Sequence, residues 1–165
     1  MEEQLKSLFA PWRMTLINNK KPKGCVFCIA KQDLKDDDYF VLFRGKNLFV
    51  MLNRYPYSTG HLLIIPNRHI NDIEQLNEEE LFEMSLLTKQ FVAILKKTFI
   101  PDGFNIGLNL GHDAGAGITD HIHLHIVPRW SGDTNFMPVI ANIKVHPTDL
   151  EGAFKLLNEQ LKKAQ

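Results

Sequence analysis

The order of elements along the sequence predicts a single α+β domain whose sheet is mostly antiparallel. Short apolar segments bounded by turn residues come first, a long amphipathic segment interrupts them, and a second helical segment ends the chain. Hydrophobic residues make up 44% and charged residues 23% of the chain, as in a globular domain with its own core. Because 165 residues are too few for two ordinary domains, we expect a single domain over 1–165, with an N-terminal arm at 1–24 and a C-terminal helix at 147–165.

Five segments have the composition of β-strands. They are Tyr39–Phe43, Asn47–Leu52, His61–Ile65, Phe104–Leu110 and the segment that starts at His121 and ends at Pro128. The first two flank a turn at 44–46, and Pro66 ends the third, because proline lacks the amide proton that a sheet requires. Residues 104–110 alternate with a period of two, which predicts a strand with one buried face.

Two helices complete the predicted domain. Asn77 and Glu80 form a capping pair at the start of the longer one. Apolar residues then recur at steps of three and four up to about Phe99; they are Leu81, Met84, Leu87, Phe91, Ile94 and Leu95. Thr148 and Glu151 form a second capping box, which predicts a last helix that ends near Lys163.

The charge and the cysteine content limit which binding partners and which cellular compartment we expect for this protein. The chain has 19 basic and 19 acidic residues, and a net charge of zero argues against a nucleic-acid partner. No apolar run is long enough to span a membrane, and the acidic N-terminus lacks the layout of a signal peptide. Two cysteines are too few for a disulfide framework. We therefore predict a cytoplasmic protein that binds neither nucleic acid nor membrane.

Three alternating histidines are the strongest functional feature. Alternate residues of a strand share a face, so His121, His123 and His125 point one way and the aliphatic residues between them point to the core. Three interpretations are open: the histidines are ordinary half-exposed residues, they bind zinc, or they are catalytic. Random placement of seven histidines rarely produces this alternation, which argues against the first interpretation.

The third interpretation is covalent catalysis at phosphorus. A neutral imidazole is a nucleophile when one nitrogen keeps its proton and the other offers its lone pair. The central position suits the nucleophile, His123, and the flanking His121 and His125 suit donors of hydrogen bonds to phosphate oxygens. The preceding loop, 111–120, is rich in glycine, whose backbone amides approach an anion closely.

The run His121-Ile-His-Leu-His-Ile-Val-Pro-Arg-Trp130 resembles the pattern of the histidine triad (HIT) superfamily. The resemblance extends from about Ala10 to about Gly132. The segments Leu52–Tyr57 and Gly103–Asn109 are similar to the bacterial branch related to fragile-histidine-triad proteins and diadenosine tetraphosphate phosphorylases. The resemblance implies the HIT-like fold, which is an antiparallel sheet with one long central helix, and it implies a two-fold dimer.

The resemblance also implies roles for individual residues. His123 falls on the histidine that becomes nucleotidylated, and His125 on a histidine that contacts phosphate. Asn53 corresponds to the residue that holds the ribose hydroxyls, Asn109 to an amide near the scissile phosphate, and His61 to a site-lining histidine. The other predicted substrate-binding residues are Gly115, Gly117 and Thr119. The loop departs from the common motif, since Gly117-Ile118 replaces a glycine-serine pair.

The spacing of Cys25 and Cys28 fits a redox pair or half a zinc site. A thioredoxin-like pair belongs beside a βαβ pattern, which the chain lacks, and a zinc site needs two more ligands. Some bacterial members of the family supply them from a histidine after the third strand and the first triad histidine. Those positions are His69 and His121 here, so the resemblance implies a structural zinc ion that fastens the N-terminal arm.

The leading prediction is an enzyme that cleaves dinucleoside polyphosphates, such as diadenosine tetraphosphate, at the α-phosphate through a nucleotidyl-histidine. It is a hydrolase if water resolves the intermediate and a phosphorylase if phosphate does. The alternatives are a nucleoside phosphoramidase and a nucleotide-binding regulatory protein with vestigial turnover. Phe82 and Leu86 add to the apolar row of the central helix, and Phe91 and Phe99 are large, which predicts a homodimer or larger homo-oligomer.

Overall fold

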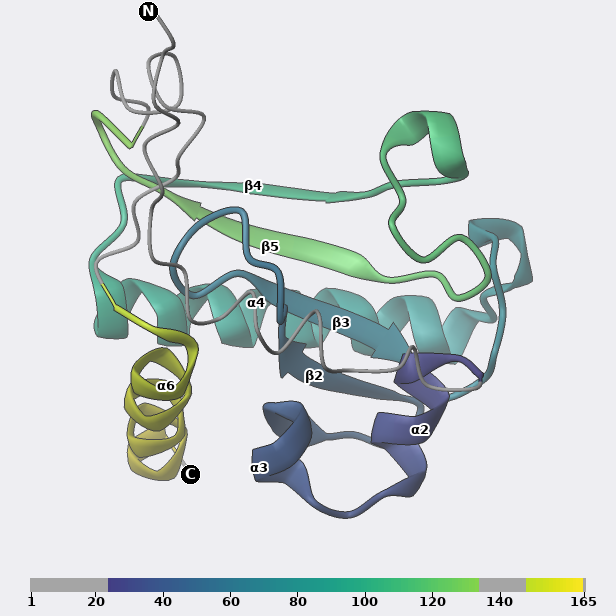
Figure 1. Cartoon of the computed structure of the whole chain (residues 1–165), viewed down its shortest axis with the longest axis horizontal. Coiled ribbons are helices and arrows are strands. Elements are labelled where there is room, and N and C mark those ends of the chain that lie inside the picture. Colours follow the sequence, from purple (N-terminus) through teal and green to yellow (C-terminus); the bar gives the residue numbers. More distant parts are fainter. Residues whose placement is uncertain (1–23, 134–147, 165) are drawn as a thin grey trace, which may run out of the picture.

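The computed structural model describes residues 24–133 and 148–164, which form one five-stranded antiparallel sheet with helices on both faces (Figure 1). The strand order is β1-β2-β3-β5-β4. The strands are β1 (Val41–Arg44), β2 (Leu48–Leu52), β3 (Leu62–Pro66), β4 (Gly103–Leu108) and β5 (Leu124–Arg129). The predicted α+β class with an antiparallel sheet is confirmed. The predicted arm falls outside the described residues, except for Gly24.

The described helices are α2 (Val26–Gln32), α3 (Asp36–Tyr39), α4 (Glu78–Phe99) and α6 (Leu150–Ala164), with 3-10 turns at Ile73–Gln75 and His112–Ala114. The long helix begins as predicted, because the side chains of Asn77 and Glu80 each accept the other residue's amide proton. The cap of α6 is one residue later than predicted, since the Asp149 carboxylate accepts the Gly152 amide. None of the described helices is long and apolar enough to cross a membrane.

The central strands are buried on both faces. On one face, alternate residues of β2, β3 and β5 pack against α4 and α6; they include Leu48, Val50, Leu52, Leu62, Ile64 and Ile126. On the other face, the intervening residues of β2 and β3 pack against α2; they are Phe49, Met51, Leu63 and Ile65, with Phe27 and Ala30 from the helix. The sheet therefore separates a large core from a smaller one beneath α2, and the two figures place α4 and α2 on opposite sides.

Four details differ from the sequence-based expectations. The first strand starts at Val41, because Tyr39 ends the short helix α3. Leu81 is 42% exposed, although its spacing placed it on the core face of α4. The outer strand β4 has only a partly buried face, since it lies at the sheet edge and Ile106 is 46% exposed.

The fourth difference is Pro128, which lies inside β5 instead of ending it. β3 pairs with β5 only as far as Ile126, so the missing amide of Pro128 breaks no ladder bond on that side. Its carbonyl accepts a hydrogen bond from the Ser58 hydroxyl.

Candidate functional site

The histidine segment enters the sheet later than predicted. Regular strand structure begins at Leu124, so His125 lies in β5 whereas His121 and His123 precede it. The side of the aliphatic neighbours agrees with the prediction, since Ile122 is buried in the large core. The imidazoles of His123 and His125 remain adjacent, with ring centroids 4.8 Å apart.

His123 is held in a single tautomer. Its Nδ1 lies 2.8 Å from the carbonyl oxygen of His121, and because a carbonyl only accepts, Nδ1 carries the proton. The Nε2 lone pair is therefore the one left for chemistry. The side chain is 6% exposed, and burial lowers the pKa of His123, which favours the neutral, nucleophilic ring.

His125 is oriented by a chain of hydrogen bonds that starts at a backbone amide. The amide of Tyr57 donates to Nδ1 of His61 at 3.0 Å, so Nε2 of His61 carries the proton. That nitrogen lies 2.9 Å from Nδ1 of His125 and donates to it. The proton of His125 is consequently on Nε2, which is buried and has no partner in the structure. A buried, unpaired N–H is a donor that awaits an acceptor.

Electrostatics keep His125 neutral. Burial, assisted by the neighbouring His123, lowers its pKa to about 4. A tyrosine ring, Tyr57, stacks on the imidazole at 5.8 Å with an interplanar angle of 17°. At neutral pH the group therefore offers a hydrogen bond without a net charge.

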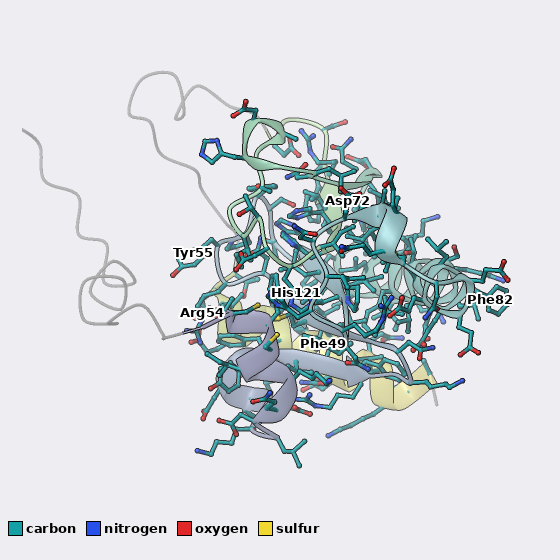
Figure 2. All side chains as sticks on the ribbon, turned by 90° about the vertical axis from the view of Figure 1, so that its right-hand side faces the viewer. Phe49, Arg54, Tyr55, Asp72, Phe82 and His121 are labelled. Carbon is teal, nitrogen blue, oxygen red and sulfur yellow. The ribbon has the colours of Figure 1, made fainter. Side chains whose placement is uncertain are left out.

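The first histidine faces a different set of partners. Nε2 of His121 lies 3.0 Å from the carbonyl oxygen of Pro66, so Nδ1 is unprotonated and points toward sulfur. It lies 3.3 Å from Sγ of Cys25 and 3.7 Å from Sγ of Cys28. Burial lowers the pKa of His121. Figure 2 places this residue in the interior next to α2.

The four predicted metal ligands form one cluster. Ligand atoms of Cys25, Cys28, His69 and His121 all lie within 4.8 Å of one another. Nδ1 of His69 is 3.3 Å from Sγ of Cys28. Ideal tetrahedral zinc bonds to sulfur and nitrogen place the two ligand atoms about 3.6 Å apart, which these distances match.

The donor chemistry also fits a metal. Burial and the adjacent Cys25 raise the pKa of the Cys28 thiol, because two neighbouring thiolates repel each other without a cation between them. The Nε2–H of His121 donates a hydrogen bond to the Pro66 carbonyl, as the second ring nitrogen of metal-binding histidines commonly does. Phe27, which lies between the two cysteines in the sequence, packs against both histidines. Its ring centroid is 5.4 Å from that of His121 and 5.0 Å from that of His123.

The remaining predicted residues fall in two places. Asn53 lies beside the histidines, with Nδ2 3.3 Å from Nδ1 of His61. Asn109 points to the glycine loop, where its Nδ2 is 3.5 Å from the Gly115 carbonyl. Gly117 and Thr119 are exposed on the same loop. Positive φ at Gly115, 91°, suits a glycine at the end of the 3-10 turn.

Several contributors have no sequence pattern that reveals them. The amide of Tyr57 and the carbonyl of Pro66 set the tautomers, yet backbone groups leave no mark in a sequence. Gly107 pairs with His125 across the sheet, and a side chain there would meet open space. Arg129, four residues beyond His125, is bound by Asp133.

Comparisons with known proteins agree with this geometry. A model of the HIT domain matches residues 35–132. An AP-4-A phosphorylase from Mycobacterium tuberculosis is 37% identical over 164 residues, which cover 94% of this chain and 84% of that protein. An asymmetrical bis(5'-nucleosyl)-tetraphosphatase from Schizosaccharomyces pombe is 32% identical over 93 residues, covering 56% of this chain and 50% of that protein.

A solved structure shares the architecture as well. A Zn-bound histidine triad family protein from Mycobacterium smegmatis matches with a TM-score of 0.68 at 27% identity, covering 86% of this chain and 95% of that one. The family model spans more than half of the chain, and the histidine segment lies within the matched residues. This chain belongs to the HIT family.

Proposed function

We propose that this protein cleaves dinucleoside polyphosphates through a covalent nucleotidyl intermediate on His123. The observation that supports it most directly is the hydrogen bond from Nδ1 of His123 to the His121 carbonyl, which leaves Nε2 as the nucleophile. The names of the HIT-family relatives, an AP-4-A phosphorylase and a bis(5'-nucleosyl)-tetraphosphatase, support the substrate class.

In the first step, Nε2 of His123 attacks the α-phosphorus. A P–N bond forms and the bond from phosphorus to the bridging oxygen breaks, so diadenosine tetraphosphate releases ATP and leaves AMP on the histidine. The ring becomes cationic, and the His121 carbonyl stabilises that charge through the Nδ1 proton. In the second step, water attacks phosphorus and releases AMP, or inorganic phosphate attacks and releases ADP.

Neighbouring groups assist the transfer by hydrogen bonding. The unpaired Nε2–H of His125 donates to a phosphate oxygen, and His61 keeps that proton in place. Asn53 holds the ribose, and Gly115, the amide of Gly117, Asn109 and Thr119 line the phosphate chain; the amide of Gly115 itself donates to the His112 carbonyl. The assignment of Asn53 is supported by its contact with His61, and those of Gly115, Gly117, Asn109 and Thr119 follow the family pattern.

We also propose that Cys25, Cys28, His69 and His121 hold one zinc ion. The supporting observations are the interatomic distances, the unprotonated Nδ1 of His121 and the Zn-bound relative. Zinc with four protein ligands has no open position for substrate, so its role is structural. One of those ligands, His121, also supplies the carbonyl that fixes the tautomer of His123.

The reaction is tested by product analysis with diadenosine tetraphosphate. In phosphate-free buffer we expect AMP and ATP in equal amounts. Added phosphate should divert part of the AMP to ADP, and labelled phosphate found in ADP would establish phosphorolysis. Ile118 stands where the family pattern has a serine, and a lost neutral donor costs about 0.5–1.5 kcal/mol, so we expect hydrolysis to persist beside phosphorolysis.

The runner-up substrates are nucleoside phosphoramidates. They require the same histidine, so the product assay is repeated with adenosine 5'-phosphoramidate at equal concentration. Rapid cleavage of this compound together with no cleavage of any dinucleoside polyphosphate would overturn the substrate assignment. A protein that binds nucleotides and turns over neither substrate would support the regulatory alternative.

We further propose a homodimer. On α4, Leu81, Phe82 and Leu86 are 42%, 68% and 49% exposed, whereas Phe91 belongs to the core and Phe99 packs against it. Such a patch is typical of an interface. Sedimentation at micromolar concentration should give at least a dimer, and Phe82→Glu with Leu86→Glu should shift it to monomer.

The matched control for this experiment is Leu156→Glu on α6, which is 44% exposed and lies outside the α4 patch. It should leave the sedimentation coefficient unchanged. A wild-type protein that sediments as a monomer would refute the dimer.

A further inference from the structure

One of the four metal-ligand candidates lacks the support that the others have. Cys25 and Cys28 belong to the first turn of α2, and His121 is 1% exposed. His69, in contrast, is exposed and lies on an irregular segment between β3 and the turn at Ile73–Gln75. Its position therefore depends on what holds the residues beside it.

The residue directly before it is clamped to the long helix. Nε of Arg68 donates to Oε1 of Glu80 at 2.8 Å, and a terminal nitrogen donates to Oε2 at 2.6 Å. The same terminal nitrogen donates to the Gln75 carbonyl at 2.6 Å. Two parallel bonds from a planar guanidinium to one carboxylate fix both distance and direction.

The carboxylate of this pair is itself immobile. Glu80 is 2% exposed and lies in the first turn of α4. Its Oε2 also accepts the amide proton of Asn77, which caps the helix. A buried charge is unfavourable unless it is paired, so Arg68 is what makes the burial of Glu80 tolerable. The Arg68–Glu80 pair thus ties the segment of His69 to the longest helix of the domain.

A second attachment lies on the other side of the ligand. The amide of Ile122 donates to the carbonyl of Ile70 at 2.7 Å, which joins this segment to the backbone between His121 and His123. Both neighbours of His69 are therefore held in place: Arg68 by the ion pair and Ile70 by this backbone hydrogen bond. Only the first of the two involves side chains that a substitution can remove.

We propose that the Arg68–Glu80 ion pair positions His69 for the metal ion and thereby sets the metal affinity of the site. This inference rests on the zinc site proposed above. Without the ion pair, His69 leaves the cluster, and Cys25, Cys28 and His121 form a three-ligand site. A zinc ion held by three protein ligands takes water in the fourth position, so a closed structural site becomes an open one.

The test measures zinc affinity by competition with a chromophoric chelator. Glu80→Gln keeps an amide oxygen for the Asn77 cap but loses the charge, and Arg68→Gln removes the guanidinium from a side chain that is 50% exposed. Loss of a group that orients a ligand lowers metal affinity about 10- to 100-fold, and we expect this for both variants. Arg68→Lys keeps the charge without the paired geometry and should give an intermediate affinity.

The matched control is Glu79→Gln. Glu79 lies in the same helical turn and pairs with Lys46 at 2.8 Å, but both side chains are exposed, at 69% and 77%. It should leave zinc affinity unchanged. Substitution of cobalt(II) adds a readout that general destabilisation does not produce, because its visible spectrum reports the ligands and the coordination number. We expect the Glu80→Gln and Arg68→Gln spectra to show a lost histidine ligand.

The outcomes are distinguishable. A wild-type protein that binds no zinc would remove the metal site itself, and the positioning role with it. A wild-type protein that binds zinc tightly, with unchanged affinity and cobalt spectrum in both variants, would overturn the positioning role alone. If either single variant fails to fold, the double variant Arg68→Gln with Glu80→Gln decides, because it removes the ion pair and leaves no unpaired charge buried.

Discussion

We expect His123→Ala to lower kcat for dinucleoside polyphosphate cleavage on the order of 10⁴-fold or more, because the covalent route loses the atom that attacks phosphorus. His125→Ala should lose about 10²- to 10³-fold, the usual effect of removing one hydrogen-bond donor to developing charge. The second loss is smaller because the nucleophile remains, held in its tautomer by the His121 carbonyl.

Steady-state kinetics and a trapping experiment check these values. With substrate labelled at the α-phosphate, wild-type protein and His125→Ala should acquire label that is stable to base and labile to acid, as for a phosphorus–nitrogen bond. His123→Ala should acquire none. As a control, His112→Ala removes an imidazole whose side chain is 90% exposed and paired with Asp113, and it should stay within a few-fold of wild type. Near-normal activity of His123→Ala would refute the mechanism.

Removal of zinc should have the second largest effect. When free zinc is present at 100 times the dissociation constant of its site, binding stabilises the folded state by about 2.7 kcal/mol. For a domain of this size that corresponds to a fall in Tm of about 5–11 °C when the metal is removed. We expect the purified protein to contain about one zinc ion per chain, which metal analysis of protein prepared without chelator would measure.

Zinc removal should also lower turnover while the substrate still binds. β5 begins only at Leu124, so no sheet ladder holds the backbone of His121 and His123. This backbone is held instead by the bond from the Ile122 amide to the Ile70 carbonyl and by the side chain of the proposed metal ligand His121, whose own carbonyl orients the nucleophile. We expect kcat to fall more than KM changes, both on chelation and in Cys28→Ser.

Thermal unfolding and kinetics with and without a chelator provide the check. Cys28→Ser should resemble chelated wild-type protein, and chelator should have no further effect on it. The Tm and kcat of wild-type protein should return when zinc is restored. An unchanged Tm in protein shown to have lost its zinc would contradict the structural role.

The regular elements followed from local patterns in the sequence. The spacing of apolar residues and the Asn77–Glu80 cap located α4, because a helix is determined by neighbours three and four residues apart. Alternation and turn residues located the strands to within a few residues. The short helices α2 and α3 were not predicted, since neither has enough residues to establish a periodicity.

For the site, the sequence predicted the candidate residues: alternating histidines, paired cysteines and a glycine-rich loop are rare in combination, and the family resemblance implied His69 and His121 as metal ligands. Only the tertiary structure showed which ring nitrogen of each histidine keeps its proton. Backbone groups of Pro66 and Tyr57, from other parts of the chain, fix the tautomers of His121 and, through His61, of His125. Every residue type has the same backbone groups, so no sequence pattern marks which of them meets an imidazole, and none marks the pairing of Arg68 with Glu80.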